Sequence, residues 1–443
     1  MGKSGHSPGE GGGVGCTTFH SLSQFPDKFR DRVLTSRLSD NRILCTELKV
    51  FLMNLIAVIF LGLFVNLAPT PPKTLVLDGV TLAQNARALK TGGAPEKAKA
   101  LQQLVEKANV VLASGTLYSV MQKTPLPPSG NKHDYMSQGP YWWADPSKPD
   151  GKPYIRKDGQ RNPEIDGITD HDQLHDMIVD TELMALAYYY TRQEKYAQHA
   201  ARLLRTWFLD EATKMNPHLN YGQGIPGITE GRGIGIIDSR GMYRAIDAAI
   251  LLQTSKSWKA GDQAALKNWF SDYLTWLTES PIGRDEADEH NNHGTYYDVQ
   301  VVASALFCGR DELARKQLET TKARLASQLQ PDGSQPHELA RTLSWNYTNM
   351  NLYGFLILAR LAEQVSVDLW NYHTADGKGI RPAIDWLVPY AKNEKEWTHQ
   401  QIKARTFENT ALIFGTASKK YREPAYGTVA AGTGLDFIQV LTN

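Results

Sequence analysis

The sequence predicts an all-α protein in which helical hairpins form an (α/α) toroid, an incomplete barrel with long loops on one rim. Apolar residues recur with helical periodicity through most of the chain from residue 73 onward. Short connections alternate with long ones that are rich in Gly, Pro, Asn and aromatic residues. Turns that carry a Leu recur at Leu204, Leu274, Leu325 and Leu387. Their spacings of 70, 51 and 62 residues are too uneven for a solenoid with a fixed repeat. An irregular all-helical domain is the alternative.

The helices follow from this periodicity, and the segment HDMIVDTELMALAYYYT gives the clearest apolar face. Strand signals are sparse, and only TLVLDGV at 74–80 is a candidate. The expected helices span residues 80–90, 96–113, 172–191, 194–209, 239–253, 262–279, 295–308, 311–329, 349–364, 380–391 and 404–418.

The N-terminal part differs in composition from the rest. Residues 50–68 form an apolar run of 19 residues, and a Pro-rich break follows it. The run predicts an export signal, with a retained membrane anchor as the alternative. We therefore expect residues 1–72 to be an extension with a signal peptide or anchor, whose leader could begin near Met53. Residues 73–443 are expected to be a single catalytic toroid domain in the periplasm or outside the cell.

Composition limits the partners. The chain has 48 Lys+Arg and 47 Asp+Glu, which gives a formal net charge of +1. It therefore lacks the excess of positive charge that is typical of a nucleic-acid-binding protein. Its three cysteines form no C-x-x-C pair, which excludes zinc ribbons and thioredoxin-type sites. We expect no cofactor, no metal and no stable protein partner.

The long loops carry the candidate functional residues. Rigid aromatic side chains in the loop 124–168 suit stacking on sugar faces, although they could instead fasten the loop to the core. The loop 213–238 and the residues after it offer groups that bind hydroxyls and carboxylates, and its glycines lack the G-x-G-x-x-G spacing of nucleotide sites. The candidates are Tyr141, Trp142, Trp143, Gln223, Glu230, Arg232 and Arg240.

Two further loops hold the groups with the most specific chemistry. In 280–294, Asn292 and His293 come at a helix start, where free N–H groups favour an anion. The simpler interpretation is that Asn292 only caps the helix. The loop 330–348 adds Arg341 and Tyr347 as candidate catalytic residues and His337 and Glu338 as candidate substrate-binding residues.

An amide, an imidazole, a guanidinium and a phenol together predict β-elimination from a uronic acid polymer. Neutralising the C6 carboxylate makes the C5 proton more acidic, because charge develops on an enolate-like oxygen. A base removes this proton and an acid protonates the departing O4. When the C5 proton and O4 lie on the same side of the sugar, one Tyr can perform both steps. When they lie on opposite sides, a His is a natural base and the Tyr is the acid.

The segments NNHGTYYDVQ, DGSQPHELARTLSWNY and the PYWW…NPE loop resemble the alginate lyase-like superfamily, which includes polysaccharide lyase families 5 and 38. The resemblance covers residues 80–420 and implies an (α/α) toroid that cleaves alginate or glucuronan. It implies that Asn292 and Arg341 neutralise the carboxylate, that His293 neutralises it or acts as base, and that Tyr347 is the acid and also the base. The loop MNPHLNYGQ…TEGRGIG is closer to family 38.

Three alternatives remain at this stage. A glycoside hydrolase on the same toroid would need two carboxylates across the bond. A non-catalytic glycan-binding protein would need only the aromatic loops. A metal enzyme would use His171 and His175, which are four residues apart on a predicted helix, but these two otherwise line the substrate cleft. The hydrolase candidates are Asp285, Glu286, Asp288, Glu289, Asp298 and Glu338.

Overall fold

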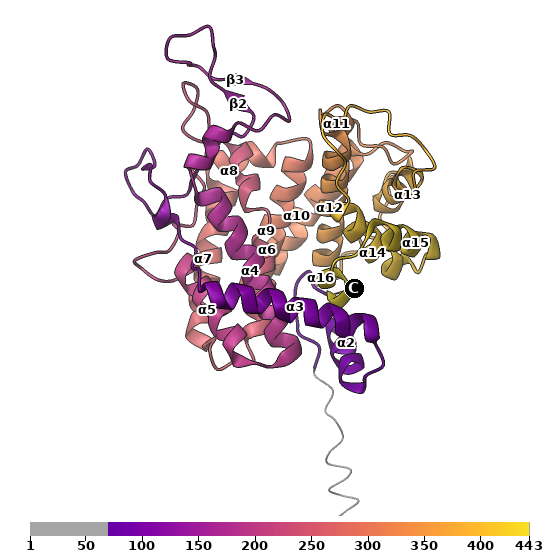
Figure 1. The fold of residues 1–443 in the computed structure, drawn as a ribbon. Coiled ribbons are helices and arrows are strands. Elements are labelled where there is room, and N and C mark those ends of the chain that lie inside the picture. The colour runs from indigo at the N-terminus through magenta and orange to yellow at the C-terminus, as the bar shows by residue number, and fades with distance from the viewer. Residues whose placement is uncertain (1–69, 443) are drawn as a thin grey trace, which may run out of the picture. The chain divides into compact units, whose positions relative to one another are not determined.

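An inner layer of long helices forms the centre of the computed structural model, which describes residues 70–442. Each inner helix packs against the next one along the chain, from the first to the last (Figure 1). Together they form the inner wall of the expected (α/α) toroid. The inner helices are α4 (Asp170–Thr191), α6 (Met242–Leu252), α9 (Asn292–Cys308), α12 (Ser344–Glu363) and α14 (Glu408–Tyr421).

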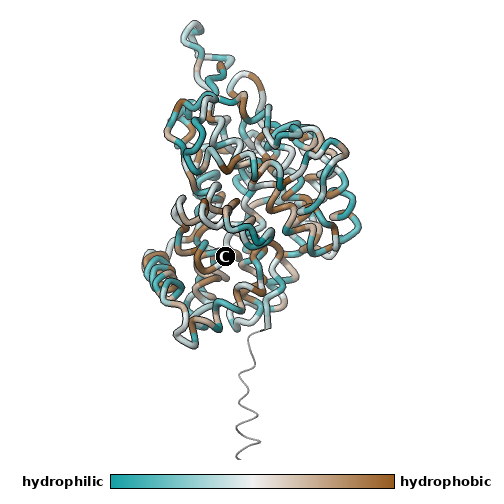
Figure 2. The backbone as a smooth tube through the Cα atoms, turned by 90° about the vertical axis from the view of Figure 1, so that its right-hand side faces the viewer, coloured by the Kyte–Doolittle hydropathy of each residue, from teal (hydrophilic) through white to brown (hydrophobic). Residues whose placement is uncertain are grey.

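Outer helices pack behind the inner ones. For example, α5 packs on α4, α7 and α10 pack on α9, and α15 packs on α14. Along these helices hydrophilic and hydrophobic residues alternate within each turn, as a two-layer packing requires (Figure 2). The outer helices are α3 (Pro95–Ser114), α5 (Glu194–Phe208), α7 (Ala260–Glu279), α10 (Asp311–Gln328), α13 (Ile380–Ala391) and α15 (Pro424–Thr433).

The sequence of α9 explains why this helix lies at the centre. Nearly all of its side chains are buried, including the polar Asn292, Asp298 and Gln300. A helix without a polar stripe must be covered on every side, and α6, α7, α10 and α12 all contact it. Its buried polar groups are hydrogen-bonded: Asp298, for example, accepts from Thr321 and from Arg324.

The small strands and short helices belong to the loops. Strand β1 (Met136–Gln138) pairs in parallel with β4 (Tyr221–Gly224), and β2 (Trp142–Trp143) pairs antiparallel with β3 (Ile155–Arg156). The β2–β3 hairpin, α8 and α11 lie at one end of the fold, and α2 lies toward the other (Figure 1). The short helices are α2 (Gly79–Thr91), α8 (Pro281–Ala287), α11 (Pro336–Leu339) and α16 (Phe437–Thr442), with 3-10 turns at Val120–Gln122, Pro163–Gly167 and Gly233–Ser239.

The candidate strand at 74–80 does not form. Residues 75–77 are a bend without a strand partner, and α2 begins at Gly79. The backbone N–H groups of Leu75, Val76 and Leu77 donate to the buried carboxylate of Asp247 on α6, at 2.5, 3.0 and 2.8 Å. Because one side chain satisfies all three donors, the segment needs no neighbouring strand.

Most helix boundaries were predicted to within two residues. Helix α6 begins at Met242 rather than 239, and α14 spans Glu408–Tyr421 rather than 404–418. Helix α9 begins at Asn292 rather than 295, and α12 begins at Ser344 rather than 349. Both helices therefore extend further into the loops that carry the candidate catalytic residues. The sequence analysis also missed α8, α11, α15 and α16, which are short.

The apolar run 50–68 lies outside the described residues. Within residues 70–442, no helix is both long and apolar enough to cross a membrane. The described residues, 70–442, all belong to one compact unit.

Candidate active site

The N-terminal ends of the inner helices share one rim of the toroid. Each inner helix follows a long connection, and each outer helix returns the chain to the same rim, so the inner helices run in one direction. Their positive dipole ends and free N–H groups consequently face the same side. The candidate catalytic residues lie on this rim, at the beginning of α9 and α12.

The start of α9 is held in place by neighbouring groups. The Asn291 side chain caps the helix by accepting from the His293 N–H at 2.9 Å, so Asn292 is free of the capping role. Arg324 on α10 donates to the carbonyls of Ala287 and Glu289 just before the helix. A side chain in place of Gly294 would collide with the Arg324 guanidinium, because a Cβ there would lie 2.0 Å from its Nη1.

Asn292 is fully buried, and Glu338 orients its side chain. The Glu338 carboxylate accepts from the Asn292 backbone N–H at 2.7 Å and from Nδ2 at 2.9 and 3.1 Å. Burial raises the pKa of Glu338, while the hydrogen bonds from Asn292 act in the opposite direction. Among the described residues, Asn292 Oδ1 has no hydrogen-bond partner. Glu338, predicted to bind substrate, therefore lies behind Asn292 and holds it.

His293 is mostly covered, and a second buried carboxylate orients its ring. Its Nδ1 lies 2.9 Å from Oε1 of Glu286, a residue of α8 whose side chain is 0% exposed, whereas 13% of the His293 side chain is exposed. Burial raises the pKa of Glu286, and the interaction with His293 lowers it in part. The ring nitrogen that remains for other partners is Nε2.

Tyr347 lies in the first turn of α12, and groups from two other segments surround it. Its phenol oxygen is 2.8 Å from that of Tyr141, which comes from the long aromatic loop. The guanidinium of Arg341 lies 3.8 Å from the centroid of the Tyr347 ring. Burial raises the pKa of Tyr347 well above the ordinary value for tyrosine, the proximity of Tyr141 raises it further, and the charge of Arg341 lowers it in part.

Arg341 is itself paired with the aromatic loop. Its Nη2 donates to Asp158 at 2.9 Å, and the hydroxyl of Thr342 donates to the same carboxylate. Burial alone would raise the pKa of Asp158, but these partners lower it to about 2. Asp158 and Tyr141 together fasten the loop 139–164 to the start of α12.

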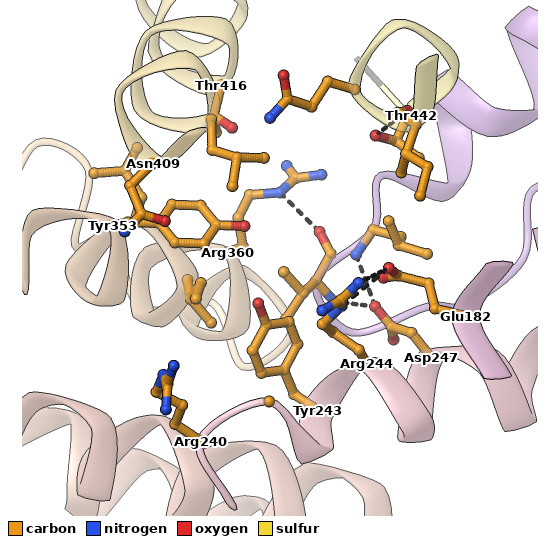
Figure 3. Close-up of a pocket in the computed structure, with 18 of the residues that line it drawn as sticks. Glu182, Arg240, Tyr243, Arg244, Asp247, Tyr353, Arg360, Asn409, Thr416 and Thr442 are labelled. Atoms are coloured by element: carbon orange, nitrogen blue, oxygen red, sulfur yellow. Dashed lines mark hydrogen bonds and ion pairs between the residues drawn. The ribbon is translucent and has the colours of Figure 1, made fainter. Parts of the chain in front are cut away.

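A cavity of about 580 Å³ lies between α4 and α6 on one side and α12 and α14 on the other (Figure 3). Residues one turn apart on each helix line it, starting near the catalytic rim. On α12, for example, Met350 and Tyr353 line the cavity and lie about one and two turns beyond Tyr347, which is not itself part of the lining. The cavity therefore continues from the rim into the interior of the toroid.

Three of the predicted substrate-binding residues line this cavity, namely Arg240, His171 and His175. The Arg240 Nη1 donates to the Ile237 carbonyl at 3.2 Å, and no carboxylate among the described residues pairs with its guanidinium. Desolvation and the charges of Arg240 and Arg244 lower the pKa of His175. By contrast, the Arg244 guanidinium is neutralised by the carboxylate of Glu182.

The remaining predicted substrate-binding residues have other contacts. The Gln223 side chain donates to Asp238 and accepts from Arg232, and the guanidinium of Arg232 lies 5.9 Å from the Trp142 ring centroid. Trp143 donates to the Gln160 carbonyl. These residues shape the aromatic loop and its base.

Two predicted residues lie apart from the cluster of Asn292, His293, Arg341 and Tyr347. Glu230 is exposed and lines a separate shallow hollow beside β1 and β4. The exposed His337 stacks edge-on against His290, with ring centroids 4.7 Å apart.

The contacts of the candidate carboxylates disfavour the hydrolase alternative. Glu286 and Glu338 are buried against His293 and Asn292, and Asp298 pairs with Arg324. No group of three metal-ligating side chains assembles within residues 70–442, so His171 and His175 gain no third ligand there.

Sequence analysis missed the orienting role of Glu286 and the contribution of Asp158. Glu286 was only one of several candidate carboxylates in an acidic stretch, and Asp158 follows Lys157 in a loop without periodicity. Asp158 is 183 residues from Arg341, a pairing that only the tertiary structure reveals.

Comparison with known proteins identifies the family. The alginate lyase family model matches residues 119–397, which include all four candidate catalytic residues. The chain belongs to the alginate lyase family. A solved structure of an alginate lyase from Bacteroides ovatus is similar to this lyase with a TM-score of 0.79 and 40% sequence identity, and the match covers 84% of this chain and 99% of that one. No curated protein sequence matches the chain.

A more distant structure confirms the fold. Alginate lyase A1-III of Sphingomonas species A1, solved as a variant complexed with a tetrasaccharide, is similar with a TM-score of 0.50 and 18% identity, covering 73% of this chain and 88% of that chain. The (α/α) toroid and the polysaccharide lyase class predicted from the sequence are thus confirmed.

Proposed function

We propose that this lyase cleaves a 1,4-linked polyuronate, poly-mannuronate or glucuronan, by β-elimination and leaves a 4,5-unsaturated uronate at the new chain end. One observation carries the proposal: a phenol, an imidazole, an amide and a guanidinium gather at the adjoining N-terminal ends of α9 and α12. These are the groups that the reaction needs around C5, O4 and the C6 carboxylate. The family and the Bacteroides ovatus enzyme support alginate as a substrate.

In this proposal His293 and Arg341 meet the C6 carboxylate and stabilise the enolate-like charge that develops there. Asn292 joins them by giving the substrate carboxylate an Nδ2 hydrogen that Glu338 accepts in the free protein. The substrate carboxylate replaces Asp158 as the partner of Arg341. Helix α9 contributes the positive end of its dipole at the same place. Loss of one such donor costs catalysis a factor of about 10²–10³ in enzymes that stabilise an oxyanion.

Tyr347 takes the C5 proton and protonates O4 from the same side of the sugar ring. Its raised pKa keeps the phenol protonated in the resting enzyme. Before the base step this phenol proton leaves to solvent, and the nearby Arg341 guanidinium favours the resulting phenolate. The phenolate then takes the C5 proton and passes it to O4, which regenerates the phenolate. Tyr141, hydrogen-bonded to Tyr347, marks the place that a substrate oxygen would take.

Neighbouring uronates of the chain reach the cavity below the rim. Arg240 supplies a guanidinium that no carboxylate of the described residues neutralises, and His175 lies near it. These groups suit the carboxylate of a second sugar unit. Tyr141, Trp142 and Trp143 provide aromatic surface at the rim for the rest of the chain.

The test is an ultraviolet absorbance assay on poly-mannuronate, poly-guluronate, glucuronan and hyaluronan in parallel. Elimination creates a C4–C5 double bond that absorbs, and hydrolysis does not. We expect the fastest rise on poly-mannuronate or glucuronan, whose proton and leaving group lie on the same side. Depolymerisation without an absorbance rise would contradict the lyase mechanism, and action on poly-guluronate alone would contradict Tyr347 as both acid and base.

We also propose that the enzyme is exported and acts in the periplasm or outside the cell, either released or anchored through residues 50–68. A polymeric substrate of the cell exterior is consistent with export. Fractionation of producing cells, together with N-terminal sequencing of the mature protein, tests this. A full-length protein in the cytoplasm would contradict it.

A further inference from the structure

We propose that Glu286 is a positioning residue for His293. Its carboxylate binds the Nδ1 proton, fixes the rotation of the ring and leaves Nε2 as the nitrogen that meets the substrate. This inference rests on the proposed function, because His293 has to face the substrate carboxylate. It assigns a role to a buried acid that no step of the elimination uses directly.

The geometry of the pair supports the proposal. The Glu286 Oε1 to His293 Nδ1 distance of 2.9 Å is that of a good hydrogen bond, and a carboxylate accepts only from a protonated Nδ1. The partner of one ring nitrogen determines what the other can do. Because the Glu286 side chain is fully buried, water cannot take its place on Nδ1.

The second Glu286 oxygen makes the contact with His293 more important. Among the described residues, Oε2 has no hydrogen-bond partner, so Oε1 and its contact with His293 Nδ1 carry the side-chain hydrogen bonding of this buried acid. Because Glu286 occupies Nδ1, the Nε2 side of the ring is the one that can meet the uronate carboxylate.

The surrounding charges do not replace this interaction. The groups that act electrostatically on Glu286 include two acidic neighbours, Asp285 and Glu289, which oppose its ionisation. The Arg232 guanidinium and the phenols of Tyr273 and Tyr297 are close enough to interact electrostatically with Glu286. On the other side of His293 lies Glu338, which is bound to Asn292.

Glu286 is also held rigidly, as a positioning residue must be. Its own backbone lies in α8, which Ser280 caps by accepting from the Gly283 N–H at 2.9 Å. Directly after α8, Arg324 binds the Ala287 and Glu289 carbonyls while its Nε pairs with Asp298 of α9. These contacts fix the distance between α8 and the first turn of α9.

The test is Glu286→Gln, which keeps the size of the side chain and an oxygen for Nδ1–H but removes the charge. We expect kcat to fall about 10- to 100-fold with KM changed less than about twofold, as for other groups that orient a functional histidine. A merely structural disturbance of the site would raise KM together with the fall in kcat.

Two comparisons make the result specific. Glu289→Gln removes a carboxylate from the same region without touching His293, and it should leave kcat within about twofold of the wild-type value. In the wild-type protein, two-dimensional ¹H–¹⁵N NMR of the ring, assigned with His293→Gln, should show a protonated Nδ1 across neutral pH. This measurement needs neither activity nor the folding of Glu286→Gln.

The outcomes separate the two proposals. Absence of unsaturated product from the wild-type enzyme overturns the proposed function. If the wild-type enzyme is active, an unchanged kcat in Glu286→Gln, or a wild-type ring with Nδ1 unprotonated, overturns the positioning role alone. A fall in kcat with an equal rise in KM would indicate a merely structural role and counts against the proposal.

Discussion

The phenol oxygens of Tyr347 and Tyr141 lie 2.8 Å apart although the two residues are 206 positions apart in the sequence. This hydrogen bond joins the first turn of α12 to the aromatic loop. It brings the proposed acid and base into contact with the loop that would cover the sugar chain, so loop and catalytic phenol are coupled directly.

We predict that Tyr347→Phe lowers kcat by about 10²–10⁴, because acid and base steps are both lost while the ring still packs under Arg341. The measurement is the initial rate of absorbance increase on poly-mannuronate and glucuronan. Tyr141→Phe is the matched control: it removes the other phenol of the same hydrogen bond and should cost only about tenfold. Equal losses in the two variants would argue against a special role for Tyr347.

We predict that Arg341→Lys does not restore the activity lost in Arg341→Ala. A lysine ammonium cannot reproduce the planar guanidinium that stacks on Tyr347 and binds Asp158 through Nε and Nη2. Both variants should lose a factor of about 10² or more in kcat/KM. Arg284→Ala, at an exposed position of α8, serves as the control for loss of a positive charge. Full activity of Arg341→Lys would show that charge alone suffices.

We predict that Arg240→Ala raises KM for long polyuronates by about tenfold and changes kcat little, because Arg240 lines the cavity rather than the cluster around Tyr347. The loss of one charge-assisted hydrogen bond, about 1.5 kcal/mol, corresponds to this factor. Steady-state kinetics on chains of increasing length measure it. If short and long substrates are affected equally, Arg240 does not contact a second sugar unit.

We predict that Asp158→Asn destabilises the folded protein by about 1 kcal/mol at pH 7, the modest value expected for a partly exposed ion pair. The pKa of Asp158 in the fold, about 2, is below its unfolded value of about 3.9. Its contribution is therefore complete above about pH 4 and disappears as the pH falls through 2. Urea unfolding of both proteins at several pH values tests this, and a constant difference down to pH 2 would contradict the ion pair.

We predict that Asp247→Ala destabilises the protein by about 2–3 kcal/mol, because it leaves the buried N–H groups of Leu75, Val76 and Leu77 without their acceptor. Asp247→Asn retains one acceptor oxygen and should cost less. Denaturant unfolding measures both. An Asp247→Ala protein as stable as the wild type would mean that residues 74–78 are not fastened to α6.

The sequence by itself determined the helical architecture and the polysaccharide lyase class. Periodic apolar residues specify a helix locally, so α4, α7, α10 and α13 could be placed within about two residues. Asn292, His293, Arg341 and Tyr347 could be chosen because their side-chain types suit a carboxylate and a proton transfer, which are properties of single residues.

The tertiary structure alone decided how these groups are held. Glu286 on His293, Glu338 on Asn292 and Asp158 on Arg341 are pairings between loops and helices, and no periodicity encodes them. The same holds for residues 74–77, whose β-like composition was overruled because Asp247 accepts their backbone hydrogen bonds. Local patterns set the secondary structure, but the partners of buried polar groups depend on which segments the fold brings together.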